Sequence, residues 1–76
     1  MGAVTLTQVP LGTTARLSDT SAHPRRQRLA ELGLRPGTDV HVMSRTSGGG
    51  RVLGIGQSRM AVDRSTLDAL LVEPPA

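Results

Sequence analysis

The chain has 76 residues, of which 37% are hydrophobic and 20% charged, which is enough for one small globular domain. It contains no cysteine and no aromatic residue, which excludes a disulfide framework, a thiolate metal site and a core built on aromatic rings. All nine basic residues are arginines and the net charge is +3, so the composition favours an acidic partner: nucleic acid, a protein face or an anionic membrane.

Two short strands are predicted near the N-terminus. Residues 4–6 alternate apolar and polar side chains, and a turn containing proline and glycine follows. Residues 13–17 place Ala15 and Leu17 on one face, as expected for a half-buried strand. The polar residues 18–21 are expected to form a loop.

A short helix is predicted next. Leu29 and Leu32 lie three residues apart on one helical face, and arginines cover much of the remaining surface. Ser21 is the preferred N-cap by residue type, whereas the spacing fits His23 better. Pro24 suits the first helical turn, where its missing N–H costs nothing.

The helix is expected to end at Gly33, because a helix C-terminus commonly needs a residue in the left-handed conformation. Pro36 prevents the helix from continuing. We expect Leu34 to pack back against the helix and Pro36-Gly37 to turn the chain into a strand over residues 39–45. A helix, a turn and a strand therefore form a corner.

A hairpin is predicted after this corner. Residues 46–50 contain three glycines and read as a flexible connection. Residues 51–55 and 59–62 each show apolar side chains at a period of two, and residues 56–58 can turn the chain between them.

A single helical turn is predicted near the C-terminus, with Asp63 or Ser65 as its N-cap and with Leu67 and Leu70 buried. Residues 71–73 form a last short strand. The chain thus consists of short strands joined by tight turns, and closure into a barrel would remove vulnerable strand edges. We predict a mainly β fold: a small SH3-like antiparallel barrel of about five strands with one short helix and one helical turn, in a single domain spanning residues 1–76.

Catalysis and metal binding are poorly supported. The chain has two histidines and six acidic residues, and it lacks a G-x-S-x-G motif, so we do not expect an enzyme. His41 and Met43 share a strand face that His23 could approach, but two separated histidines make weak support for a metal site. We therefore assign no catalytic residue, no metal ligand and no cofactor.

The glycine run over residues 47–51 resembles a loop that cradles phosphate. Such loops lead into a helix N-terminus, and here a strand is predicted to follow. A flexible loop between two strands is the better interpretation.

The arginines around the predicted helix are the best candidate for an interaction surface. Nucleic acid is disfavoured as their target, because small single-strand binders offer aromatic stacking platforms and this chain has none. Beside an apolar corner, these arginines fit an acidic protein face better. The candidate partner-binding residues are Arg25, Arg26, Arg28, Leu32, Leu34 and Arg35.

Nearly the whole chain resembles one family. Residues 28–40 read R-L-x-x-L-G-L-x-P-G-x-x-V, and this pattern resembles the FeoA family of bacterial ferrous iron transport accessory proteins, whose fold is shared with a C-terminal domain of DtxR-type metal-dependent repressors. Residues 6–12, 60–62 and 70–72 are similar to the family's opening, L-A-L and closing motifs. Two positions depart from the pattern. Position 27 is often basic in the family but is Gln27 here, and position 67 is commonly a small alanine but is Leu67 here.

The resemblance implies a cytoplasmic accessory protein that binds and modulates FeoB, a membrane transporter of ferrous iron with a cytoplasmic GTP-binding domain. It further raises the hypothesis that Arg25 or Arg26 reaches the GTPase as a stimulating arginine finger. Two alternatives remain open: a regulatory SH3-like protein-binding module related to metal-dependent repressors, and a basic nucleic-acid-binding barrel.

The expected location follows from the same sequence. The N-terminus lacks a signal-peptide pattern, and no apolar run approaches the roughly 20 residues that span a membrane. We expect contact with the membrane only through the partner. The oligomeric state stays open, because the exposed strands of such a barrel could pair between two copies.

Overall fold

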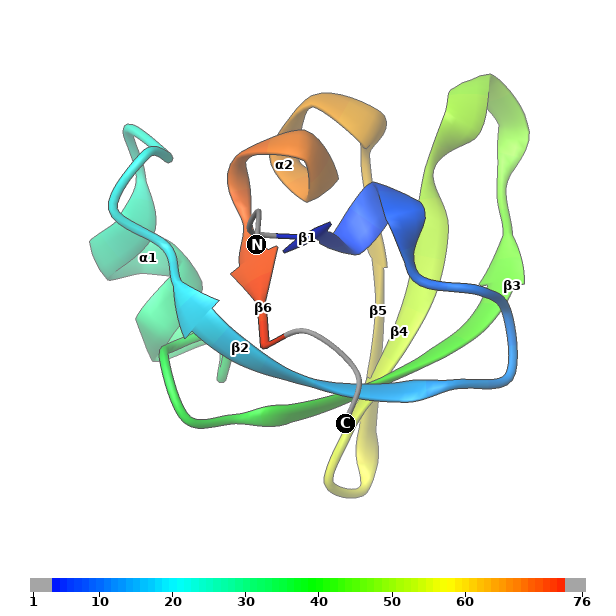
Figure 1. Ribbon diagram of the computed structural model, residues 1–76, viewed down its shortest axis with the longest axis horizontal. Coiled ribbons are helices and arrows are strands. Elements are labelled where there is room, and N and C mark those ends of the chain that lie inside the picture. The colour runs from blue at the N-terminus through cyan, green and yellow to red at the C-terminus, as the bar shows by residue number, and fades with distance from the viewer. Residues whose placement is uncertain (1–3, 74–76) are drawn as a thin grey trace.

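Six antiparallel strands form one strongly curved sheet in the computed structural model, which describes residues 4–73 (Figure 1). Its order is β1-β6-β2-β3-β4-β5. The strands are β1 (Val4–Thr5), β2 (Thr14–Asp19), β3 (Asp39–Arg45), β4 (Arg51–Ile55), β5 (Ser58–Val62) and β6 (Leu71–Val72). Two α-helices, α1 (Arg26–Glu31) and α2 (Arg64–Ala69), and two 3₁₀ turns, η1 (Leu6–Gln8) and η2 (Ser47–Gly49), connect them. The predicted mainly β, SH3-like architecture is confirmed, with six strands instead of about five.

Strand β2 is shared by the two halves of the barrel. Its first part pairs with β3, where Ala15 lies opposite Val40, and its second part pairs with β6, where Leu17 lies opposite Val72. The prediction of a loop from residue 18 is wrong, because the chain stays extended through Asp19. Pairing with β6, which lies more than fifty residues further along the chain, extends the strand beyond its local apolar pattern.

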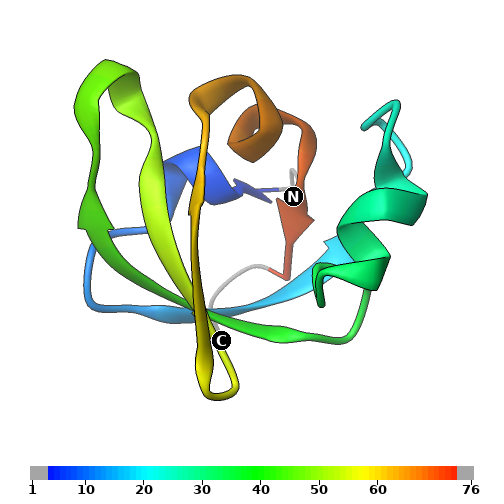
Figure 2. The ribbon, with the colours of Figure 1, turned by 180° about the vertical axis from the view of Figure 1, so that it is seen from behind.

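Strands β3, β4 and β5 form a meander. Strand β3 pairs with β4, with a register shift between Val42 and Ser44, and β4 pairs with β5 through a two-residue turn. The hairpin predicted from the period of two is confirmed, and β5 begins one residue earlier than expected. In Figure 2, β5 crosses the front of the molecule as the last strand of the sheet.

Helix α2 and the 3₁₀ turn η1 cover the end of the barrel between its first and last strands (Figure 1). The backbone N–H of Leu6 donates to the carbonyl of Leu70 at 3.0 Å, and both side chains are fully buried. The predicted opening strand therefore stops at Thr5, since Leu6 already belongs to η1. The last helical segment is also longer than the predicted single turn.

Helix α2 begins at a side-chain cap. One carboxylate oxygen of Asp63 accepts from the backbone N–H of Thr66 at 3.4 Å and also from the Ser65 hydroxyl, while the other accepts from the Thr66 hydroxyl at 2.6 Å. These bonds favour the ionised carboxylate, the one from Ser65 most strongly, and they lower the pKa of Asp63 to about 2. The prediction that Asp63 or Ser65 caps this segment is confirmed for Asp63.

The core is aliphatic, as a chain without aromatic residues requires. It takes inward-facing residues from the strands and others from η1, α2 and the segments beside them, and the predicted burial of Leu67 and Leu70 is confirmed. The buried apolar residues are Leu6, Val9, Leu17, Leu34, Val40, Val42, Leu53, Val62, Leu67, Leu70 and Val72. Within residues 4–73, both α-helices are far too short to cross a bilayer.

Candidate partner-binding surface

Helix α1 projects from one side of the barrel (Figures 1 and 2). Two of the six candidate residues, Arg26 and Arg28, lie within it, and the other four lie at its two cap positions or in the turn that follows. The helix itself contains no buried residue, because only Leu29 and Ala30 are partly covered. All four arginines named from the sequence are exposed at this helix or in the turn after it. We call the exposed set Arg25, Arg26, Arg28, Leu32 and Arg35 the α1 surface.

Gly33 ends the helix in a complete Schellman motif. Its φ is +103°, its N–H donates to the carbonyl of Ala30 at 3.0 Å, and the N–H of Leu34 donates to that of Leu29 at 2.8 Å. The left-handed glycine and the backward packing of Leu34 are both confirmed. The chain then reverses at Pro36-Gly37, where the Thr38 N–H donates to the Arg35 carbonyl at 3.1 Å, and it enters β3. This corner fixes Arg35 beside the helix.

The two candidate leucines have different roles. Leu32 is 45% exposed and is one of two large hydrophobic residues that the described chain leaves open to solvent. Leu34 is fully buried within the core, so naming it as a contact residue is corrected here. The Schellman motif explains the difference, because it turns the chain inward directly after the helix. Leu32 remains as the apolar centre of the α1 surface.

Positive charge on this surface is largely uncompensated. Arg28 Nη1 lies 3.4 Å from Glu31 Oε1, and both side chains are about two-thirds exposed, so this pair contributes little stability. No ion pair within residues 4–73 includes Arg25, Arg26 or Arg35. An acidic partner would therefore meet guanidinium groups that are free of competing carboxylates.

His23 positions the entry to α1. Its Nδ1 accepts the backbone N–H of Arg25 at 3.0 Å, which leaves the proton on Nε2, 3.2 Å from the hydroxyl of Thr66. Thr66 in turn donates to Asp63, so the start of α1 is tied to the cap of α2. The helix begins at Arg26 with Arg25 at the cap position, and no side chain caps it. The predictions that Ser21 or His23 caps the helix and that Pro24 lies in its first turn are wrong.

Several carboxylates outside α1 are already engaged by other groups. Arg16 Nε lies 3.0 Å from Asp39 Oδ1 and 3.9 Å from Glu73 Oε2, and its hydrogen bond with Asp39 raises the pKa of Arg16. The backbone N–H of Ser21 donates to Asp19 at 2.8 Å, and bonding from Ser21 lowers the pKa of that carboxyl. These three carboxylates therefore form no ion pair with the arginines of the α1 surface.

The three residues considered for a metal site, His23, His41 and Met43, each contact different neighbours. Nδ1 of His41 lies 2.9 Å from the hydroxyl of Thr14 in β2, whereas Nε2 of His23 lies 3.2 Å from the hydroxyl of Thr66 in α2. Met43 is half-buried, with its sulfur against Gly54. Within residues 4–73 no three histidine or acidic side chains gather as a metal site would need.

Two concave features were missed by sequence reasoning. A groove of about 500 Å³ runs between η1, β2 and β6, with Val9, Pro10 and Ala15 among its apolar lining residues and the Arg16–Asp39 pair at its rim. A smaller pocket lies beside η2 and is lined by three arginines. Both bring together segments far apart in the chain, so no local pattern signals them.

Solved structures place this fold among small SH3-like proteins. FeoA of Stenotrophomonas maltophilia, determined in complex with zinc and described as an SH3 domain protein, is 30% identical over 93% of this chain and 91% of that chain, with a TM-score of 0.75. FeoA of Chlorobium tepidum is 23% identical over 96% of this chain and 71% of that chain, with a TM-score of 0.84. Both similarities cover nearly the whole described barrel.

The same fold occurs as part of a longer protein. IdeR of T. acidophilum matches 95% of this chain with 22% identity and a TM-score of 0.78, and the match covers 34% of that chain. No curated protein matches the sequence. The FeoA domain model matches residues 4–74. The chain therefore belongs to the FeoA domain family, whose members are related to ferrous iron transport.

Proposed function

We propose that this protein is a cytoplasmic, non-enzymatic accessory protein of ferrous iron uptake that binds and modulates a FeoB-type membrane GTPase transporter. Membership of the FeoA family supports the link to iron transport. The solved relative from S. maltophilia is described in terms of ferrous iron transport activation, which supports a modulating role for the present chain.

The observation that carries the proposal is the α1 surface. It combines an exposed leucine with four exposed arginines, three of which have no acidic partner within residues 4–73. An apolar centre surrounded by charge is the usual composition of a protein-binding patch. Leu32 would fill a small apolar pocket on the partner, and the arginines would meet carboxylates around it.

The chemistry of this surface favours protein over nucleic acid. The chain has no aromatic side chain on which a base could stack, so phosphate contacts alone would have to hold a nucleic acid. An acidic protein face can instead use both the arginines and Leu32. Charge complementarity would speed encounter at low salt, and burial of Leu32 would slow dissociation.

The test is capture of the transporter from nuclease-treated bacterial membranes, with the recovered proteins identified by mass spectrometry. The parent is compared with an Arg25→Glu, Arg26→Glu variant and with an equally charged control, Arg45→Glu, Arg59→Glu, in which both altered residues are exposed and lack acidic partners. We expect the parent and the control to recover a FeoB-type transporter and the α1 variant to lose it. Equal recovery by all three proteins would move the contact away from α1, and recovery by none would reject the proposed partnership.

A further inference from the structure

The η2 turn lies on the side of the barrel away from α1 (Figures 1 and 2). A pocket of about 320 Å³ lies beside this turn. It is formed where η1, the end of β3, the start of β4 and the start of α2 meet. Its lining residues are Thr7, Arg45, Thr46, Gly49, Gly50, Arg51 and Arg64. Three of these seven residues are arginines that come from three different elements, so the fold concentrates positive charge here.

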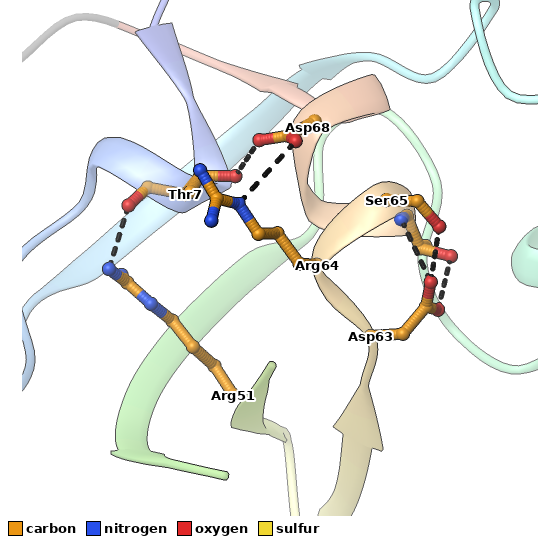
Figure 3. Close-up of polar contacts among 7 residues, drawn as sticks. Thr7, Arg51, Asp63, Arg64, Ser65 and Asp68 are labelled. Carbon is orange, nitrogen blue, oxygen red and sulfur yellow. Dashed lines mark hydrogen bonds and ion pairs between the residues drawn. The ribbon is translucent and has the colours of Figure 1, made fainter. Parts of the chain in front are cut away.

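Two of the arginines are linked through Thr7 and Asp68. Arg51 reaches from β4 to Thr7, and Arg64 reaches from α2 to Asp68, which also contacts Thr7 (Figure 3). Arg51 Nη2 donates to the Thr7 carbonyl at 2.7 Å, and Nη1 donates to the carbonyls of Leu6 and Val9. These acceptors are neutral backbone carbonyls, so they hold Arg51 in place without offsetting its charge.

Negative charge at the pocket is insufficient to balance these groups. Within residues 4–73, Asp68 is the one carboxylate that pairs with any of these arginines: Arg64 Nε lies 3.9 Å from its Oδ2. Asp68 also accepts from the hydroxyl of Thr7. Asp63 faces the other way and bonds Ser65 and the next residue (Figure 3). Arg45 has no acidic partner within residues 4–73. Like charges gathered in one small cavity are stabilised when an anion lies between them.

The glycines of η2 leave room for the arginines. A Cβ at Gly49 would lie 3.0 Å from Cδ of Arg64, so the absence of a side chain lets that arginine lie against the loop. A strand follows the loop, as predicted, so the site lacks the helix that phosphate-cradling glycine loops use. Positive charge comes instead from guanidinium groups, whose planar donor forks match a phosphate group.

We propose that this pocket binds a phosphate oxyanion, either free or as the phosphoryl group of a small ligand such as a nucleotide. Arg45 and Arg64 supply the adjustable donors, and Arg51 supplies a fixed charge at the pocket wall. The site is separate from the α1 surface and does not depend on the proposed partnership. Phosphate binding and capture of the transporter can each fail without the other.

The test is a titration of the ¹⁵N-labelled protein with inorganic phosphate, pyrophosphate and a nucleoside diphosphate, at constant ionic strength, followed by amide chemical shifts. We expect saturable shifts of the amides in residues 46–50 and at the start of α2. Arg45→Gln and Arg64→Gln should each weaken the affinity about tenfold, because each removes one charge-assisted contact with the anion. Arg59→Gln, at an exposed arginine of β5 that does not line the pocket, is the matched control and should bind like the parent.

The three probes separate the two sources of the anion. Equal affinities for pyrophosphate and the nucleoside diphosphate would assign the site to the phosphate groups alone, and tighter binding of the nucleoside diphosphate would assign it to a nucleotide. Linear, unsaturable shifts spread over all arginines would overturn the proposal. Unchanged affinity in both glutamine variants, with spectra that show the native fold, would overturn it as well.

Discussion

Replacement of Arg51 by methionine tests how the 3₁₀ turn η1 is held on the barrel. Arg51 is half-buried and donates to the carbonyls of Leu6, Thr7 and Val9, more than forty residues earlier in the chain. Methionine keeps an unbranched apolar stem of similar reach but removes all donors. The change therefore isolates the hydrogen bonds from the packing of the side chain.

The expected cost follows from what each carbonyl would lose. The carbonyl of Leu6 also accepts the Val9 N–H at 3.2 Å and keeps that partner, whereas no other hydrogen bond within residues 4–73 reaches the carbonyls of Thr7 and Val9. A partly buried carbonyl left without its charged donor costs about 1 to 1.5 kcal/mol. Two such groups give a loss of about 2 to 3 kcal/mol in the free energy of unfolding, or about 10 to 20 °C in Tm for a domain of this size.

Urea denaturation of the parent and of Arg51→Met, followed by far-ultraviolet circular dichroism, measures this cost. Arg59→Met is the matched control, because Arg59 lies exposed on the neighbouring strand and makes no hydrogen bond or ion pair through its side chain within the described residues. We expect the control to stay within about 0.5 kcal/mol of the parent. Equal midpoints for the two methionine variants would refute the argument that Arg51 fastens η1.

Three further predictions concern the α1 corner and the cap of α2. Leu34→Ala should destabilise the protein by about 2 to 5 kcal/mol, because Leu34 is fully buried, while Leu32→Ala should stay within about 0.5 kcal/mol; thermal unfolding of both variants checks the difference. Gly33→Ala should cost about 1 to 2 kcal/mol in urea denaturation, because φ is +103°, a conformation that residues with a Cβ rarely adopt, and an unchanged midpoint would contradict this. The pKa of Asp63 is lowered to about 2, so its ionised form stabilises the fold above its ordinary pKa of 3.8, and this contribution is lost as the pH falls from about 4 to 2. Asp63→Asn, whose amide oxygen can still cap α2, should show a smaller loss of Tm over that range than the parent.

Elements with local signals were predictable from the sequence. Gly33 and Pro36 determine the end of α1 through backbone conformation alone, and the structure contains the expected left-handed residue and turn. The β4–β5 hairpin likewise follows from its alternating side chains and its short turn. In these segments, neighbouring residues provide the forces that select the conformation.

Features set by distant pairing were not predictable in the same way. The extension of β2 to Asp19 depends on β6, and the conversion of Leu6 from strand to 3₁₀ turn depends on its bond to Leu70. The period of two in residues 51–55 assigns no partner to Arg51, and its role arises because η1 is brought beside it. Side chains that act through tertiary contacts leave no periodic signal.

The α1 surface likewise has features that the sequence predicts and features that depend on tertiary structure. Four arginines at a helix and its following turn could be recognised as exposed from the sequence, because the apolar stripe of the helix is narrow. The opposite burial of Leu32 and Leu34 could not be assigned securely, since it depends on how sharply the chain turns at Gly33. The arginine pocket at η2 was missed because it joins Thr7 and Arg64 to residues 45–51, and Thr7 lies more than thirty residues earlier in the chain.

The most direct test of the account is a titration of the ¹⁵N-labelled protein with the purified cytoplasmic GTPase domain of a FeoB-type transporter, observed through amide signals. The account predicts that signals from residues 25–35 shift or broaden first and that the Arg25→Glu, Arg26→Glu variant abolishes the effect. Perturbation confined to the groove beside β2 or to the β5 edge, with α1 unchanged, would contradict it.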